Sequence, residues 1–248
     1  MKKKICIGVA ITGSILIAPW AVYHETSKKI DSKKVEFGTF NKCKYFYKEA
    51  KINHYEVSTY TKLYKNGIMQ YIESNELLNE CLKRNEISCM GMYFEHPIWL
   101  KDKDLARMTY GIRVMESDDV LKTKLMEDGF EEVKLDDAEV IKVEMPYIFR
   151  ATHRICPSWM YIKLLCRISD EEWEKKHSEK GSPIIEDYHK DRIEYLYPIS
   201  NQDQFQLSSI NAPEYDIDNL NKAANFRRKY LERERLRSKF PQKTKSQT

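Results

Sequence analysis

Residues 183–199 of the chain have the sequence PIIEDYHKDRIEYLYPI. Two runs rich in isoleucine and tyrosine flank a short charged stretch, which predicts two antiparallel strands at Pro183–His189 and Arg192–Ile199. Successive side chains of a strand point to opposite faces, so Glu186 and Tyr188 are expected on the same face. This strand pair is the key to the fold, because an upstream segment repeats its pattern.

The upstream segment is a second predicted strand pair, at Ile87–Phe94 and Ala106–Met115. Three of its residues recur 87 residues later in the same frame: Asp104, Tyr110 and Ile112 correspond to Asp191, Tyr197 and Ile199. Each pair follows a predicted strand and helix, so the order strand, helix, strand, strand occurs twice. We therefore expect an α+β fold, in which a duplicated βαββ unit builds one antiparallel sheet with helices on one face and an open groove on the other.

The remaining elements follow from hydrophobic spacing and from glycine and proline positions. A strand is predicted at Lys42–Ile52, and residues 130–147 alternate like one or two strands. Helices are predicted at residues 55–85, with an interruption near Asn66-Gly67, and at residues 120–128 and 157–180. Gly129 and Gly181 follow the last two of these helices, as expected for residues that end a helix.

The segment Ile5–Tyr23 is the longest stretch without a charged residue, and Lys2, Lys3 and Lys4 precede it. A helix of this length spans roughly 28 Å, which is close to the thickness of the hydrocarbon core of a bilayer. We expect a retained transmembrane helix. The alternative is a cleaved signal peptide, against which the position of Pro19 near the candidate cleavage sites argues.

The predicted organisation has five parts. They are a short basic N-terminus (residues 1–4), a transmembrane anchor (5–23), a linker (24–40), a folded domain (41–207) and a basic, partly helical C-terminal tail (208–248). From Phe226 to Thr248 the tail has nine Lys or Arg residues against Glu232 and Glu234. This excess favours contact with anionic lipid headgroups. The chain has no recognisable nucleic-acid-binding motif, which argues against a nucleic-acid partner.

The six cysteines include no CxxC pair, and none is spaced with a histidine as zinc ligands usually are. We expect reduced, buried thiols, and neither a metal site nor a cofactor. The chain has no G-x-S-x-G motif and no phosphate-binding glycine loop, and its six histidines are scattered. The sequence therefore predicts a protein that is not an enzyme, with a weak hydrolase as the alternative.

Three stretches resemble one family: Tyr93–Val114, residues 151–163, and residues 183–199 with the motif P-x-x-E-x-Y. They look like the GyrI-like domain of the testis-expressed protein 264 family, and bacterial GyrI-like drug-binding domains share the motif. The resemblance covers about residues 5–205. It implies a single-pass anchor in the endoplasmic reticulum membrane with the domain in the cytosol. It also implies an adaptor that serves as a receptor for autophagy of the reticulum, or that recruits an AAA-type ATPase.

The tail departs from the family pattern. In the family a long acidic tail carries an aromatic-x-x-aliphatic motif that binds an autophagy modifier by adding a strand to it. Here the tail is short and basic, and the best match is Phe130-Glu-Glu-Val133 inside the domain, after Glu127 and Asp128. The alternative for Phe130 and Val133 is the beginning of a core strand.

The second candidate function is binding or hydrolysis of a small molecule in the groove around Glu186 and Tyr188. A carboxylate beside aromatic rings can bind a lipophilic cation through charge and ring contacts. The alternative is an exposed glutamate on a solvated face. Tyr93, Tyr110 and Tyr197 are further candidates for the groove, or core residues. The sequence thus leaves two functions, a membrane-anchored adaptor and a small-molecule-binding protein.

Overall fold

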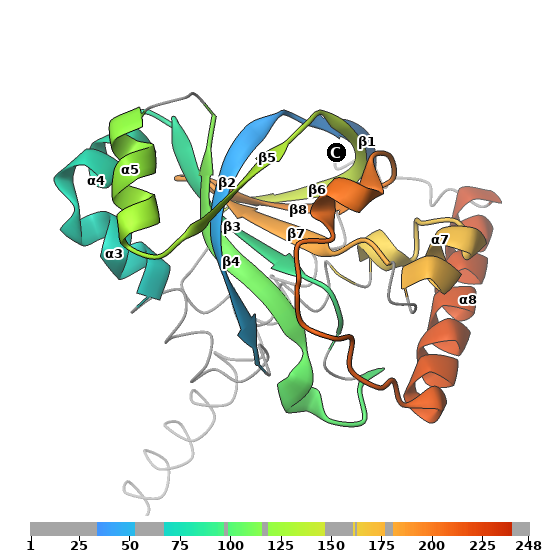
Figure 1. Cartoon of the computed structure of the whole chain (residues 1–248). Helices are drawn as coiled ribbons and strands as arrows, with labels where there is room; N and C mark the ends of the chain where they lie inside the picture. Colours follow the sequence, from blue (N-terminus) through green and yellow to red (C-terminus); the bar gives the residue numbers. More distant parts are fainter. Residues whose placement is uncertain are drawn as a thin grey trace, which may run out of the picture.

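Eight strands form one antiparallel sheet that curls around itself (Figure 1). The computed structural model describes residues 34–52, 67–96, 99–115, 119–146, 161, 163–176 and 181–239. The strands are β1 (Glu36–Phe40), β2 (Cys43–Lys51), β3 (Ile87–Tyr93), β4 (Arg107–Val114), β5 (Glu131–Leu135), β6 (Ala138–Pro146), β7 (Ile184–Tyr188) and β8 (Arg192–Pro198). Both strand pairs predicted from the sequence are confirmed, since β3 pairs with β4 and β7 pairs with β8.

The order of the strands in the sheet is β1-β6-β8-β7-β3-β4-β2-β5. β3 and β7 pair at the centre, with β4 and β2 on one side and β8 and β6 on the other. β1 pairs with β6, and β5 pairs with β2. Each half of the chain therefore contributes its first strand to the edge of the other half, which ties the two halves into one sheet.

The predicted linker, residues 24–40, is wrong at its C-terminal end, because Glu36–Phe40 forms the edge strand β1. Phe40 is 1% exposed and packs edge-to-face against Phe205, with ring centroids 5.3 Å apart. The five residues carry no hydrophobic alternation strong enough to predict a strand. The strand is stabilised by its pairing with β6 and by burial of Phe40, and neither contact can be read from the local sequence.

The described helices are α3 (Met69–Ser74), α4 (Glu76–Lys83), α5 (Asp119–Glu127), α7 (Asp170–Lys176) and α8 (Ile217–Lys239). The helix expected at residues 55–85 is divided at Asn75, whose backbone is extended and whose side chain accepts a hydrogen bond from the backbone N–H of Leu78. The helix expected at 157–180 is also divided. Helical residues at 161 and 163–165 are followed by a turn, and α7 begins at Asp170.

The sheet has a hydrophobic core on each face. The first, the helix-side core, joins one face of the strands to Ile72 of α3, Leu78 of α4 and Leu125 of α5. The second, the inner core, lies on the opposite face inside the curl and comprises Phe40, Cys43, Tyr45, Tyr47, Met90, Met92, Phe94, Leu135, Ala138, Val140, Ile185, Leu196 and Phe205. All these residues are buried. The open groove predicted opposite the helices is therefore wrong, since side chains fill that face.

Close approach of two strands accompanies the curl. A Cβ atom at Gly111 of β4 would lie 1.9 Å from the carbonyl oxygen of Phe46 in β2. Because real atoms do not approach so closely, only glycine allows β4 and β2 to pass at this distance.

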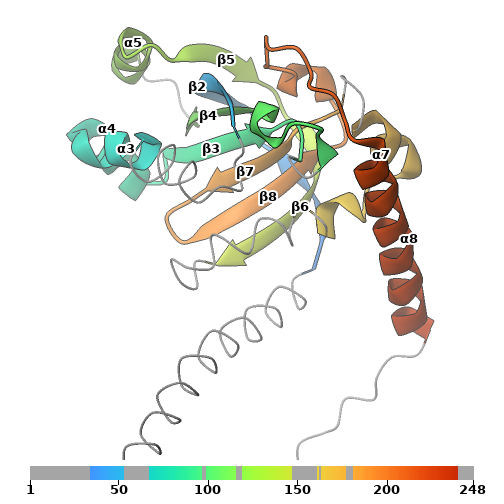
Figure 2. The ribbon, with the colours of Figure 1, turned by 90° about the horizontal axis from the view of Figure 1, so that it is seen from below.

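The predicted boundary between domain and tail at residue 207 is also wrong, because the following segment packs onto the domain. Helix α8 lies alongside α7 (Figure 2). Arg227 of α8 donates hydrogen bonds to the carbonyl oxygens of Leu165 and Ile168 and pairs with Asp170. Its guanidinium also lies over the ring of Trp173. Part of the predicted basic surface is thus engaged inside the molecule.

The predicted transmembrane segment, Ile5–Tyr23, lies outside the described residues. Among the residues that are described, no helix combines the length and the apolar character that crossing a bilayer requires.

Candidate functional site

Glu186 lies near the middle of the sheet, on β7, with only 3% of its surface exposed. It lies directly opposite Gly91 of β3 and Tyr195 of β8. Its neighbours at alternate positions, Ile184 and Tyr188, belong to the helix-side core. The predicted shared face of Glu186 and Tyr188 is therefore correct, but this face is neither solvated nor an open groove. It is the face that the helices cover.

Three tyrosines surround the carboxylate. The hydroxyl of Tyr188 donates a hydrogen bond to Glu186, and the hydroxyls of Tyr93 and Tyr161 also favour its charged form. The rings of Tyr93 and Tyr161 meet edge-to-face, with centroids 6.0 Å apart. The site thus combines one acidic group with several aromatic rings from β3, β7 and a short helical segment.

Burial dominates the electrostatics of this site. Loss of water around the carboxylate raises the pKa of Glu186 from 4.5 to about 7, although the three tyrosine hydroxyls act in the opposite direction. No lysine, arginine or histidine among the described residues contributes to that pKa. A carboxylate with such a pKa changes charge near neutral pH, and no basic side chain in the described part of the chain offsets the effect of its burial.

The other two predicted site residues lie on other strands of the sheet. Tyr110 is half-buried on β4 and packs against the helix-side core, and it lies opposite Gly91, the same residue of β3 that Glu186 lies opposite from β7. Tyr197 is fully buried on β8, and its hydroxyl donates to Glu172 of α7 at 3.3 Å. Of the five candidates, Tyr188 and Tyr93 interact with the carboxylate of Glu186, and Tyr110 lies across Gly91 from it. Tyr197 belongs to the core.

Tyr161 is the member of this site that the sequence did not identify as a site residue. It stands 25 residues before Glu186 and is 2% exposed. Only the packing of its helical segment against β7 brings its hydroxyl to the carboxylate. The one sequence signal was that it belongs to a stretch resembling the GyrI-like family.

The candidate modifier-binding motif lies at the edge of the sheet that β5 forms. Phe130 is 6% exposed, packs against the ring of Tyr71 and carries the ammonium of Lys48 over its ring. Val133 is half-buried on β5, opposite Tyr45 of β2. Before Phe130 could anchor a partner protein, it would have to leave the core.

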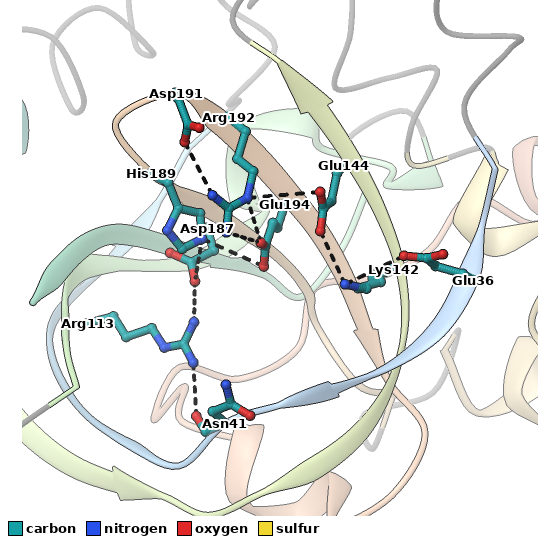
Figure 3. Close-up of polar contacts among 10 residues, drawn as sticks. All are labelled: Glu36, Asn41, Arg113, Lys142, Glu144, Asp187, His189, Asp191, Arg192 and Glu194. Atoms are coloured by element: carbon teal, nitrogen blue, oxygen red, sulfur yellow. Dashed lines mark hydrogen bonds and ion pairs between the residues drawn. The ribbon is translucent and has the colours of Figure 1, made fainter. Parts of the chain in front are cut away.

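A second polar cluster lies behind Glu186, on the opposite face of the same strands. Asp187 is fully buried and forms an ion pair with Arg113 of β4 (Figure 3). Burial would raise the pKa of Asp187, but His189 and Arg113 outweigh this effect and lower it to about 2. For His189, whose charged form is the protonated one, burial lowers the pKa. The neighbouring carboxylates of Asp187 and Glu194 outweigh this effect and raise the pKa to about 9. The sequence had predicted no role for these residues.

No protein-family model and no curated protein matches the chain. Solved structures with a distant likeness were found. The C-terminal domain of EcmrR is 12% identical with a TM-score of 0.39, over 67% of this chain and 97% of that chain. SAV2435 bound to tetraphenylphosphonium is 11% identical with a TM-score of 0.37, over 68% and 94%. An integron cassette protein from Vibrio cholerae is 10% identical with a TM-score of 0.41, over 66% and 94%. At this level of likeness no residue role is transferred.

Proposed function

We propose that this protein binds a lipophilic organic cation at Glu186. One observation carries the proposal: a carboxylate buried in the helix-side core is surrounded by tyrosines, and no basic side chain in the described part of the chain contributes to its pKa. Burying a charge without a partner lowers the stability of the folded state. A group kept at such a cost is a candidate for a functional role. A bound cation would supply the missing counter-charge.

The rings at the site suit the same type of ligand. The faces of Tyr93, Tyr161 and Tyr188 present electron-rich surfaces, and a cation over such a ring gains about 0.5–2 kcal/mol. A strongly hydrated ion would lose its water on entering this apolar environment, whereas an organic cation with aromatic or aliphatic substituents loses much less. The combination therefore favours a large cation of low hydration.

Binding requires a local movement. Glu186 and Tyr161 are both almost fully buried, so a ligand reaches the carboxylate only after the side chains around it move, and we propose that Tyr161 is one of them. The described helical residues around Tyr161 end in a turn after residue 165, and short segments of this kind are among those that open locally. We propose binding alone and assign no catalytic step to the site.

Thermal unfolding with tetraphenylphosphonium tests this proposal. The full-length protein should be stabilised by the compound in a concentration-dependent way, because only the folded state binds it. The Glu186→Gln variant keeps the shape of the side chain but removes the charge, and its stabilisation should vanish. Glu172→Gln is the matched control, since Glu172 also accepts a hydrogen bond from a tyrosine but lies at α7. Equal stabilisation by neutral triphenylphosphine oxide, or an unaltered response of Glu186→Gln, would contradict the proposal.

For the fold we propose the GyrI-like family, supported by the twice-repeated order of strands and by the resemblance of the three sequence stretches. For the location we propose that Ile5–Tyr23 anchors the domain on the cytosolic side of the endoplasmic reticulum, as an adaptor that recruits autophagy modifiers or an AAA-type ATPase. Support for this second part comes from the uncharged segment and the resemblance alone. When the protein carries a C-terminal tag, protease added to intact microsomes should degrade the tag. Protection of the tag would show that the domain faces the lumen instead.

A further inference from the structure

Three potential metal ligands lie close together on one hairpin, on the face opposite Glu186. They are Asp187 at the end of β7, His189 in the turn, and Glu194 on β8 (Figure 3). Asp187 and Glu194 are direct partners in the strand register. The backbone N–H of His189 donates to the carbonyl oxygen of Arg192 at 2.9 Å, which holds the turn. One carboxylate oxygen from each acid and one imidazole nitrogen lie within 4.8 Å of one another.

This arrangement places like charges opposite each other. Glu194 lies between Asp187 of β7 and Glu144 of β6, so three carboxylates occur in a row across adjacent strands. Like charges directly opposite in a sheet are destabilising unless a cation lies between them. Arg113 pairs with Oδ2 of Asp187, and Arg192 approaches Oε1 of Glu194 to 2.8 Å. These contacts compensate one oxygen of each carboxylate.

Two buried polar atoms remain without a hydrogen-bond partner in the described structure: Oδ1 of Asp187 and Nε2 of His189. Asp187 is 0% exposed, so bulk solvent does not reach its Oδ1 atom. An unpaired buried polar atom is destabilising, and a bound ion is one of the explanations for it.

The distances match a metal ion better than a hydrogen bond. Nε2 of His189 is 3.5 Å from Asp187 Oδ2 and 3.6 Å from Glu194 Oε2. A charge-assisted hydrogen bond would bring these atoms to about 2.7–2.9 Å. Two ligand atoms that each lie about 2.1 Å from a tetrahedral ion are about 3.4 Å apart. The two distances from His189 thus lie near the separation that an ion would require, and all three ligand atoms lie within 4.8 Å of one another.

We propose that Asp187, His189 and Glu194 bind a divalent transition-metal ion, with Zn²⁺ as the representative. An imidazole nitrogen with two carboxylates suits such an ion, whereas Ca²⁺ and Mg²⁺ prefer oxygen ligands alone. Arg113 and Arg192 would act as outer partners that orient the two carboxylates. A fourth ligand position would be left for solvent, as in zinc sites with three protein ligands.

Charge and access agree with the proposal. The two acidic ligands, Asp187 and Glu194, carry two negative charges, which a divalent ion would match when His189 binds it as a neutral imidazole. The side chains of His189 and Glu194 are 13% and 15% exposed, so an ion can reach the site from the surface.

Titration calorimetry of the full-length protein in a non-ionic detergent, with ZnCl₂ as the only added metal, tests the site. We expect saturable binding of one equivalent in the micromolar range or tighter. His189→Gln and Glu194→Gln each remove one ligand and should weaken binding on the order of tenfold or more. Glu144→Gln is the matched control, because this neighbouring strand glutamate also lies near Arg192 but is not a ligand; its affinity should equal that of the wild type.

Binding of Co²⁺ gives a second readout, since a tetrahedral site with nitrogen and oxygen ligands absorbs visible light without the near-ultraviolet band of a thiolate ligand. Circular dichroism establishes whether each variant is folded. If one of the two ligand variants does not fold, the other is enough to test the site. Absence of saturable Zn²⁺ binding by the wild type would show that the cluster is an ion pair around a protonated imidazole. Wild-type affinity in both ligand variants would equally overturn the proposal.

Discussion

Replacement of Arg113 by methionine is expected to lower the free energy of unfolding by about 3–5 kcal/mol. The variant leaves the carboxylate of Asp187, which is 0% exposed, without its closest positive charge. Arg113 is itself 4% exposed in its side chain, donates to the carbonyl oxygen of Asn41 at 2.9 Å, and lies over the ring of Phe40. Loss of the guanidinium therefore removes two contacts of β4 at once, the ion pair with β7 and the hydrogen bond to Asn41, which follows β1.

Denaturant unfolding of the full-length protein, followed by tryptophan fluorescence, measures this loss. The double variant Arg113→Met with Asp187→Asn should recover part of the stability, because the uncompensated charge is removed with its partner. Lys101→Met is the matched control for an exposed ion pair, since Lys101 and Glu214 are 63% and 77% exposed, and should be neutral. If Arg113→Met behaves like this control, the buried pair does not stabilise the fold.

A second large effect is expected from the charge of Glu186. The Glu186→Gln variant should be more stable than the wild type at alkaline pH by about 3 kcal/mol, and equal to it at acidic pH. The folded protein has a pKa of about 7 at this group, against an ordinary value of 4.5. Below the ordinary value both states are protonated and burial has no electrostatic cost.

Between these two pKa values the unfolded chain releases its proton and the folded chain keeps it, so wild-type stability falls as pH rises. Above the folded pKa the cost stays constant, because both states are ionised. Glutamine has no charge to desolvate and escapes this cost. Melting temperatures of wild type and variant, measured across this pH range, should diverge from acid to alkali. Parallel profiles would show that burial does not disfavour the charge of Glu186.

Glu132→Gln is a control in which the change in stability with pH is expected to have the opposite sign. Lys122 lowers the pKa of Glu132, so its charge favours the folded state and its removal should reduce stability as pH rises. The contrast between the two glutamates separates the effect of burial from a general effect of changing glutamate to glutamine. A stabilised Glu186→Gln variant that no longer binds a cation would also fit a site retained for function at the expense of stability.

Hydrophobic spacing was sufficient for the central strands because each of them alternates or is buried on both faces. It located β3, β4, β7 and β8 within a few residues and placed Glu186 and Tyr188 on one face. It failed for β1, whose residues form a strand only because β6 offers a partner. It predicted the helical part of the tail, which α8 confirms, but not that this charged helix packs on the domain, where Arg227 donates to carbonyl oxygens.

The sequence alone determined the two strand pairs, the repeated order of elements and the parity of side chains along each strand, because these depend on residue types a few positions apart. Tertiary structure alone decided what covers each face. Alternation says that Glu186 and Asp187 point in opposite directions, but not that Tyr161 encloses the first or that Arg113 pairs with the second. Those contacts join segments 25 and 74 residues apart, and no local pattern encodes the packing that brings them together.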